Sequence, residues 1–151
     1  MARWILSGMA ALAVMGAMAL PARPPASDGA QYTVAVATAT VEGKTKRILT
    51  DARGFALYYL TSDKATTSVC TGGCAAAWPP LLSQTQPVAP PGLPGRLTVV
   101  RTVHGPQVSY GGHLLYRYAA DAKPGEVRGN DLKGPGGGEW YVATPDLAKG
   151  G

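Results

Sequence analysis

The chain has 151 residues, of which 20 are glycine and 13 are proline, and only 15% are charged. This composition favours short strands and turns over long helices. The net charge of +5 is spread along the chain, and its one dense basic cluster, residues 44–47, lies where we expect a turn. Nucleic-acid sites need a basic stripe with exposed aromatic side chains, so we expect no nucleic-acid partner.

The first 22 residues are typical of a secretory signal peptide. Arg3 gives a positive start, residues 4–20 are almost entirely apolar, and small residues follow up to Ala22. The apolar run is short and diluted by alanine and glycine, so we expect cleavage and no stable membrane anchor, with a retained anchor as the alternative. Residues 23–30 are predicted to be a flexible lead-in, and residues 146–151 a tail.

Two segments of the chain resemble each other. Residues 54–63 (GFALYYLTSD) align without a gap with residues 112–121 (GHLLYRYAAD), and Trp78 corresponds to Trp140. A recurrence of this kind indicates two copies of one structural unit. We expect copy one at residues 31–82 and copy two at residues 95–145, within a single domain over residues 31–145.

Alternating β-branched residues predict a first strand in each copy, at residues 32–41 and 97–103. Copy two then shows strand patterns at residues 107–110, 114–118 and 139–144. We therefore predict an all-β fold of two tandem four-stranded antiparallel meanders, forming one compact pseudo-symmetric domain. Whether the copies share one sheet or form two stays open.

Strand periodicity predicts which residues share a face. Residues two apart in a strand point the same way, so Tyr58 and Leu60 lie opposite Leu57. In copy two, Tyr116 and Tyr118 share a face and Leu115 opposes them.

Cys70 and Cys74 are the only cysteines, and in an oxidising compartment a lone close pair predicts a disulfide. Closing so short a loop is worth about 2 kcal/mol, which suits pinning a local turn. The three-residue spacing does not match covalent haem attachment or a thioredoxin-type site. A redox-active or metal-bound pair is the alternative.

No coherent catalytic set is evident. His104 and His113 are acid–base candidates, but neither has a nucleophile in a recognisable setting. Asp63 and Asp121 could form a carboxylate dyad, although capping the turn after each strand is the favoured interpretation. We therefore predict no catalytic residues, no metal site and no cofactor.

Aromatic side chains are the remaining candidates for a binding role. Core packing is favoured for most of them, because the chain has only one phenylalanine. The candidate ligand-facing aromatics are Trp78, Tyr116, Tyr118 and Trp140.

Residues 116–121 form a Tyr-x-(Phe/Trp/Tyr)-x-x-Asp motif through Tyr116, Tyr118 and Asp121; copy one keeps Tyr58 and Asp63 but has Leu60 at the aromatic position. Further shared segments are residues 70–81, which end in Trp-Pro-Pro-Leu, residues 123–126 and residues 140–142. With these motifs the chain resembles an exported bacterial repeat family of predicted lipoproteins, a secreted repeat of unknown function.

The resemblance implies a fold unit and export, and no settled activity. No cysteine precedes Cys70 to carry a lipid, so we expect release as a soluble protein, periplasmic or secreted. The leading hypothesis is a non-enzymatic binding or structural module of the cell envelope. Its partner is unknown, and the candidates are another envelope protein and a small ligand. The alternative is a periplasmic small-ligand-binding or electron-transfer accessory protein that uses the aromatic faces or the Cys70/Cys74 pair.

Overall fold

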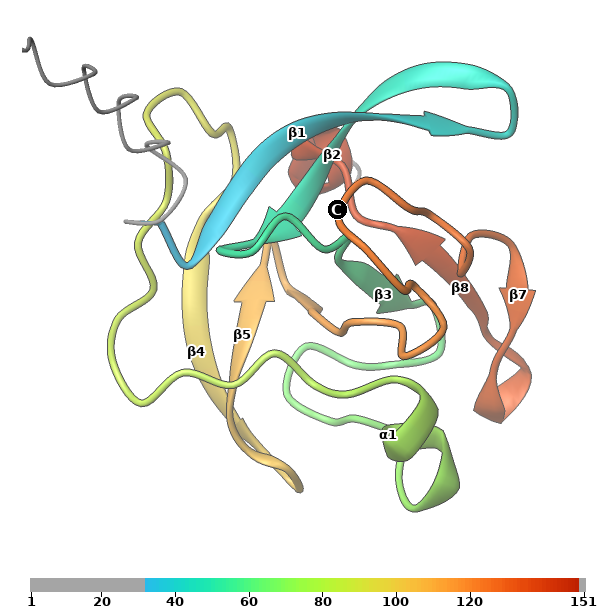
Figure 1. The fold of residues 1–151 in the computed structure, drawn as a ribbon. Coiled ribbons are helices and arrows are strands. Elements are labelled where there is room, and N and C mark those ends of the chain that lie inside the picture. The colour runs from blue at the N-terminus through green and yellow to red at the C-terminus, as the bar shows by residue number, and fades with distance from the viewer. Residues whose placement is uncertain (1–31, 150–151) are drawn as a thin grey trace, which may run out of the picture.

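The computed structural model describes residues 32–149, so the predicted signal peptide and lead-in lie outside the described residues. Most regular structure in this part is antiparallel β (Figure 1). The strands are β1 (Val34–Val41), β2 (Lys44–Asp51), β3 (Tyr58–Leu60), β4 (Leu97–Thr102), β5 (Gly105–Tyr110), β6 (His113–Leu114), β7 (Leu132–Lys133) and β8 (Glu139–Val142). The helical pieces are α1 (Gly73–Ala77), η2 (Pro135–Gly137) and η3 (Pro145–Lys149). None of these helices is long and apolar enough to cross a membrane.

Each copy begins with a hairpin. Strand β1 pairs with β2 from Val34↔Asp51 to Val41↔Lys44, and β4 pairs with β5 in the same antiparallel sense. The expected turn at residues 44–47 is wrong, because these residues are the first half of β2. The turn is made instead by Glu42 and Gly43, whose φ angles of 52° and 75° are those of a tight two-residue hairpin turn.

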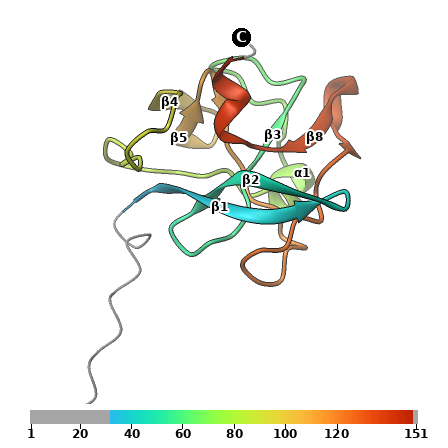
Figure 2. The same cartoon turned by 90° about the horizontal axis from the view of Figure 1, so that it is seen from above.

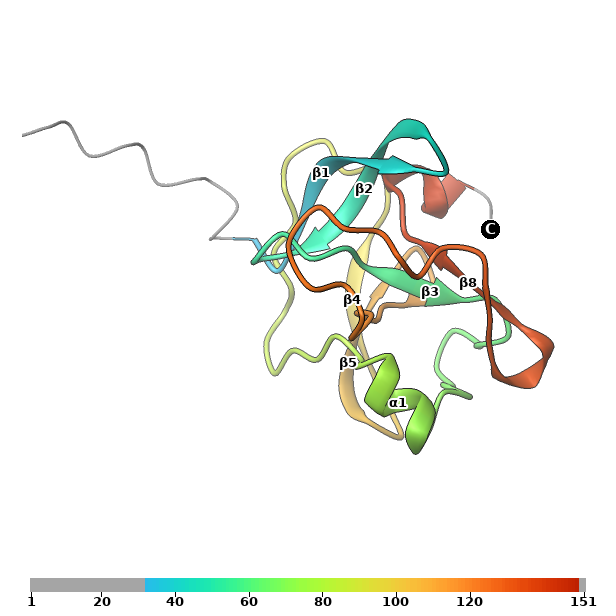
Figure 3. The same ribbon diagram turned by 45° about the vertical axis from the view of Figure 1, so that its right-hand side comes forward.

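The closing segments of the two copies are exchanged. Strand β8 of copy two pairs with β3 of copy one, in the register Tyr58↔Val142, and the two lie side by side in Figures 1 and 3. The closing segment of copy one, residues 79–81, bonds in turn to copy two. The Leu81 amide donates to the Leu115 carbonyl at 2.9 Å, and the Arg117 amide donates to the Pro79 carbonyl at 2.8 Å. Each copy therefore completes the sheet of the other.

Tyr58 and Tyr116 meet where the two copies join. Each amide donates to the other residue's carbonyl, at 2.8 and 2.9 Å, so two equivalent residues form one antiparallel bridge. This bridge links β3 to the segment that follows β6, and the bridge Thr50↔Ala56 links β2 to the segment that precedes β3. The strand orders of the three small sheets are β1-β2, β3-β8-β7 and β4-β5-β6, and Figure 2 shows the fold from above. The arrangement is an all-β domain of two repeats related by a pseudo-twofold.

Two hydrophobic clusters cover opposite faces of the central strands. One cluster contains Tyr58 and Tyr116, and the other contains Leu57 and Leu115. The predicted division of Leu and Tyr between opposite faces is confirmed. Because both faces of these strands are covered, the motif residues Tyr58, Tyr116 and Asp121 are buried, whereas Asp63 and Tyr118 are half-buried.

Candidate functional site

The tyrosines and aspartates of the repeat motif bind each other across the copies. The Tyr58 hydroxyl donates to Asp121 Oδ2 at 2.7 Å, and the Tyr116 hydroxyl donates to Asp63 Oδ2 at 2.6 Å. Each hydrogen bond joins one copy to the other, and the two bonds are related by the pseudo-twofold. We call these four residues the tyrosine–aspartate exchange.

The same aspartates also hold the turns that follow their strands. Asp63 Oδ1 accepts the Val69 amide at 2.8 Å, and Asp121 Oδ1 accepts the Arg128 amide at 2.9 Å. One oxygen of each carboxylate therefore caps a turn, as the favoured interpretation of the sequence predicted. The other oxygen of each carboxylate makes the contact between copies, which the sequence did not indicate.

Burial shifts the pKa values of the hydroxyls and carboxyls in the tyrosine–aspartate exchange. Desolvation raises the pKa of Tyr58 and of Tyr116 well above the usual tyrosine range, and the hydrogen-bonded carboxylates raise it further. Desolvation also raises the pKa of Asp63 and Asp121, while the tyrosine hydroxyls and backbone amides oppose that rise. Both hydroxyls therefore keep their protons at neutral pH and act as donors.

The structure does not support a catalytic dyad of Asp63 and Asp121. Over residues 32–149 no hydrogen bond links the two carboxylates, and each one binds the tyrosine of the opposite copy. Neither aspartate is among the groups that shift the other's pKa. A carboxylate dyad depends on the two acids sharing a proton or shifting each other's pKa.

Trp78 and Trp140, which occupy equivalent places in the two copies, stack on each other. Their ring centroids are 4.0 Å apart and their planes differ by 4°. Tyr118 stacks on Trp78, also at 4.0 Å. Tyr58 meets Trp78 edge-on and Tyr116 meets Trp140 edge-on, at 5.4 and 5.0 Å. The pseudo-twofold therefore relates these aromatic contacts as well as the hydrogen bonds.

This packing corrects the interpretation of Trp78, Tyr116 and Trp140 as ligand-facing. Tyr116 and Trp140 have no exposed surface, and Trp78 is 6% exposed. Tyr118 is half-buried against Trp78. A domain of this size has few large side chains, so its largest rings fill the space where the copies meet. None of the three buried rings offers a face to a ligand.

Copy one has Leu60 where copy two has Tyr118, and Leu60 lies against the loop that contains Gly134. A Cβ atom at Gly134 would lie 2.5 Å from Leu60 Cδ1 and 2.9 Å from Trp140 Nε1. The backbone at Gly134 therefore covers Trp140 directly. Leu60 of copy one and the backbone of Gly134 of copy two therefore lie together beside Trp140, whereas the ring of Tyr118 lies on Trp78.

A polar cluster beside the disulfide contains one of the two histidines. The Tyr116 hydroxyl lies 2.7 Å from Ser68 Oγ, and Ser68 Oγ lies 3.2 Å from His104 Nε2. His104 Nε2 also lies 2.8 Å from the Cys70 carbonyl oxygen. A carbonyl can only accept, so Nε2 carries the proton and cannot act as a base toward Ser68. Ser68 and His104 are therefore not arranged as nucleophile and base.

Sequence reasoning did not find Ser68. It reaches His104 and Tyr116 only through tertiary folding, across 36 and 48 residues respectively. No motif in the sequence marks such a serine.

The predicted disulfide between Cys70 and Cys74 is present, with the two Cα atoms 5.2 Å apart. Cys70 is fully buried, and α1 begins at Gly73, inside the disulfide loop. The bridge therefore fastens the segment that carries Ser68 to the only α-helix among residues 32–149.

The second histidine, His113, packs against an aromatic ring. Its ring lies 4.9 Å from the ring of Tyr59, and burial lowers its pKa. The equivalent contact on the other side of the pseudo-twofold places the guanidinium of Arg117 4.7 Å from the ring of Phe55. Both members of this pair of contacts are packing interactions.

The model of a family described as a secreted repeat of unknown function matches residues 39–82 and 98–144. The chain belongs to this family. The two matched segments lie within the two copies predicted from the sequence, and the family's description as secreted supports export. Neither a search of curated proteins nor a search of solved structures found a match. Across residues 32–149 no group of three or more His, Cys, Asp or Glu side chains could hold a metal ion.

Proposed function

We propose that this secreted repeat protein is a non-enzymatic module of the cell envelope with a binding or structural role, located in the periplasm or outside the cell. The observation that carries the proposal is the tyrosine–aspartate exchange. The motif that each copy contributes is used to hold the other copy.

The state of the ionisable groups supports this proposal. Catalytic acids and bases need a proton that can move near the working pH and access to a substrate. Tyr58 and Tyr116 are fully buried and their pKa values are raised far from neutrality. Asp121 is 4% exposed, and both of its oxygens accept hydrogen bonds within the protein.

The test is a screen for hydrolysis with chromogenic p-nitrophenyl esters, phosphates and glycosides. It compares the wild-type protein with Ser68→Ala and Asp63→Asn, and uses Ser83→Ala as a matched serine control. We expect no turnover above the rate in buffer for any form. Ser68→Ala and Asp63→Asn should lower the melting temperature, because each removes a partner of the Tyr116 hydroxyl.

Turnover by the wild-type protein would contradict the proposal if Ser68→Ala or Asp63→Asn abolished it while the variant was still folded at the assay temperature. Such a result would mean that these groups act on a substrate. The Ser83→Ala protein would show whether a loss of turnover is specific.

A further inference from the structure

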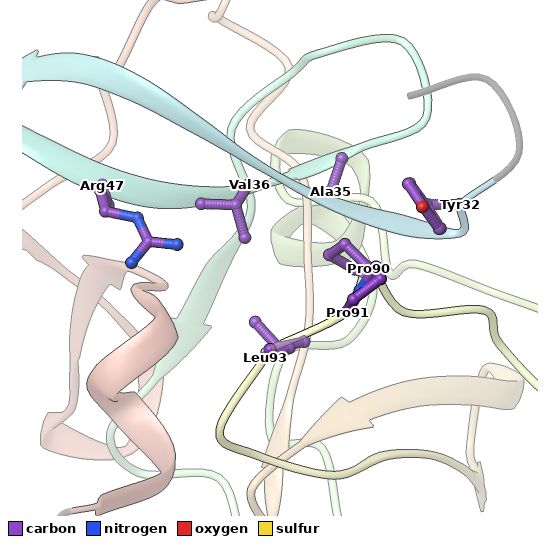
Figure 4. Close-up of a pocket in the computed structure, with 8 residues that line it drawn as sticks. Tyr32, Ala35, Val36, Arg47, Pro90, Pro91 and Leu93 are labelled. Atoms are coloured by element: carbon purple, nitrogen blue, oxygen red, sulfur yellow. The ribbon is translucent and has the colours of Figure 1, made fainter. Parts of the chain in front are cut away.

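A hollow of about 340 Å³ lies between the β1–β2 hairpin and the proline-rich turn that precedes β4 (Figure 4). It is separate from the tyrosine–aspartate exchange and from the stacked tryptophans. The residues that line it are Tyr32, Ala35, Val36, Arg47, Pro90, Pro91, Gly92 and Leu93.

The walls of this hollow are mainly apolar. Val36 and Leu93 are half-buried and pack against the second hydrophobic cluster, so the floor is continuous with the core. Pro90, Pro91 and the ring of Tyr32 add rigid surfaces along one side. Small-molecule sites combine an apolar lining of this kind with a few polar groups that fix the ligand's orientation.

Among the described residues 32–149, Arg47 is the only charged one that lines the hollow. Figure 4 shows its side chain and that of Val36 leaving the hairpin toward the side where Leu93 lies. Arg47 is exposed and forms no salt bridge with any residue of the described range 32–149. A guanidinium at the edge of an apolar hollow is suited to an anionic group.

The neighbouring charges leave an excess of positive charge at this edge. Asp146 lies close enough for Arg47 to contribute to the lowering of its pKa. The main cause of that lowering is Lys149, whose ammonium group lies 2.7 Å from Asp146 Oδ1. Two cations therefore share one carboxylate, and the carboxylate already has a partner in Lys149.

We propose that this hollow binds a small amphipathic anion. The apolar body of the ligand packs between Val36, Leu93 and the two prolines, and its carboxylate, sulfonate or phosphate group pairs with Arg47. The proposal does not depend on the role of the tyrosine–aspartate exchange. It places ligand binding at a different surface from the aromatic residues that the sequence suggested.

The probe for this proposal is anilinonaphthalene sulfonate, a fluorescent compound that joins an aromatic body to one anionic group. Phenylnaphthylamine, which has the same aromatic body without the sulfonate, is the neutral comparison. Both are titrated into the full chain and followed by fluorescence. We expect saturable binding of the sulfonate, because its two parts match the apolar walls and Arg47.

The variant Arg47→Gln should weaken binding of the sulfonate about fivefold, the magnitude of one exposed charge pair, and should leave binding of phenylnaphthylamine unchanged. Arg101→Gln is the matched control, since Arg101 is an exposed arginine on β4 that does not line the hollow. It should bind both probes as the wild-type protein does. Leu93→Trp, which fills the hollow from its floor, should weaken binding of both probes.

Three results would overturn the proposal. They are no saturable binding by the wild-type chain, the same affinity for the sulfonate in Arg47→Gln and wild type, or an equal loss in Arg47→Gln and Arg101→Gln. Melting temperatures of all variants are measured alongside, because partly unfolded protein also binds these dyes.

Discussion

The tyrosine–aspartate exchange makes a quantitative prediction for Tyr58→Phe, which removes one hydroxyl and leaves the ring. Two groups lose a partner: Asp121 Oδ2, which accepts from the hydroxyl at 2.7 Å, and the Gly129 amide, which donates to it at 3.3 Å. Losing a hydrogen bond to a buried charged group costs about 2 kcal/mol. For a domain of about 120 residues this lowers the melting temperature by roughly 8 °C.

The assay is thermal and urea unfolding of wild type, Tyr58→Phe, Asp121→Asn and the double variant. The two single losses should not add, because each one breaks the same hydrogen bond. We expect a coupling free energy of about 1–2 kcal/mol between the two positions.

Tyr59→Phe is the matched control for the loss of a hydroxyl. Tyr59 is the next residue of the same strand, and its hydroxyl makes no hydrogen bond to any residue in the described range 32–149. Two results would show that the tyrosine–aspartate exchange does not hold the copies together. One is a Tyr58→Phe protein no less stable than Tyr59→Phe, and the other is a double variant whose loss of stability equals the sum of the two single losses.

Three further predictions follow from the packing of other elements. Burial lowers the pKa of His113 below 6.5, so the unfolded chain takes up the proton first as the pH falls. As the pH falls from about 6.5 to the lowered pKa, the stability of the wild type should therefore fall. His113→Phe, which places at this position the residue found at Phe55 in copy one, should lose less stability between melts at about pH 8 and pH 5.5. An equal loss in the two proteins would contradict the prediction. Replacing Cys70 and Cys74 by serine should cost about 2 kcal/mol in urea unfolding, and an unchanged midpoint would show that the bridge adds nothing. Cleavage at a protease site engineered after Gln84 should leave both halves together on size-exclusion chromatography, since each half completes the sheet of the other; separate peaks would refute this.

The sequence predicted features that depend on local order along the chain. The alignment of the two copies gave the repeat, and the period of two placed Leu57 and Tyr58 on opposite faces. The repeat is written in the residue order itself, and the division of faces follows from strand geometry, which does not depend on what a strand packs against. The disulfide was predictable for a similar reason, because Cys70 and Cys74 are four residues apart.

The partners of these residues could not be predicted. Tyr58 and Asp121 are 63 residues apart, and a repeat pattern is equally compatible with binding to Asp63 in the same copy. Which aspartate accepts the tyrosine hydroxyl is determined by the pairing of each copy's closing segment with the other copy. Burial of the tryptophans has the same origin, because Trp78 and Trp140 cover each other only when the copies face across the pseudo-twofold.

The basic cluster at residues 44–47 was misinterpreted for a different reason. Charged side chains are common in turns, but Lys44 and Arg47 lie on a hairpin arm that solvent reaches, where β-structure tolerates charge. The stronger turn signal was Glu42-Gly43, since glycine readily adopts the positive φ required.

The exchanged closing segments also constrain the order of folding. A chain that is made or exported from its N-terminus presents copy one first, and residues 79–81 then have no strand to pair with until residues 115–117 emerge. Strand β3 likewise waits for β8, the last strand of the domain. Late pairing of distant segments makes folding slow and leaves strand edges exposed meanwhile. The protein should therefore fold only after nearly its whole length is released, which makes the half-emerged chain the form most in need of protection from aggregation.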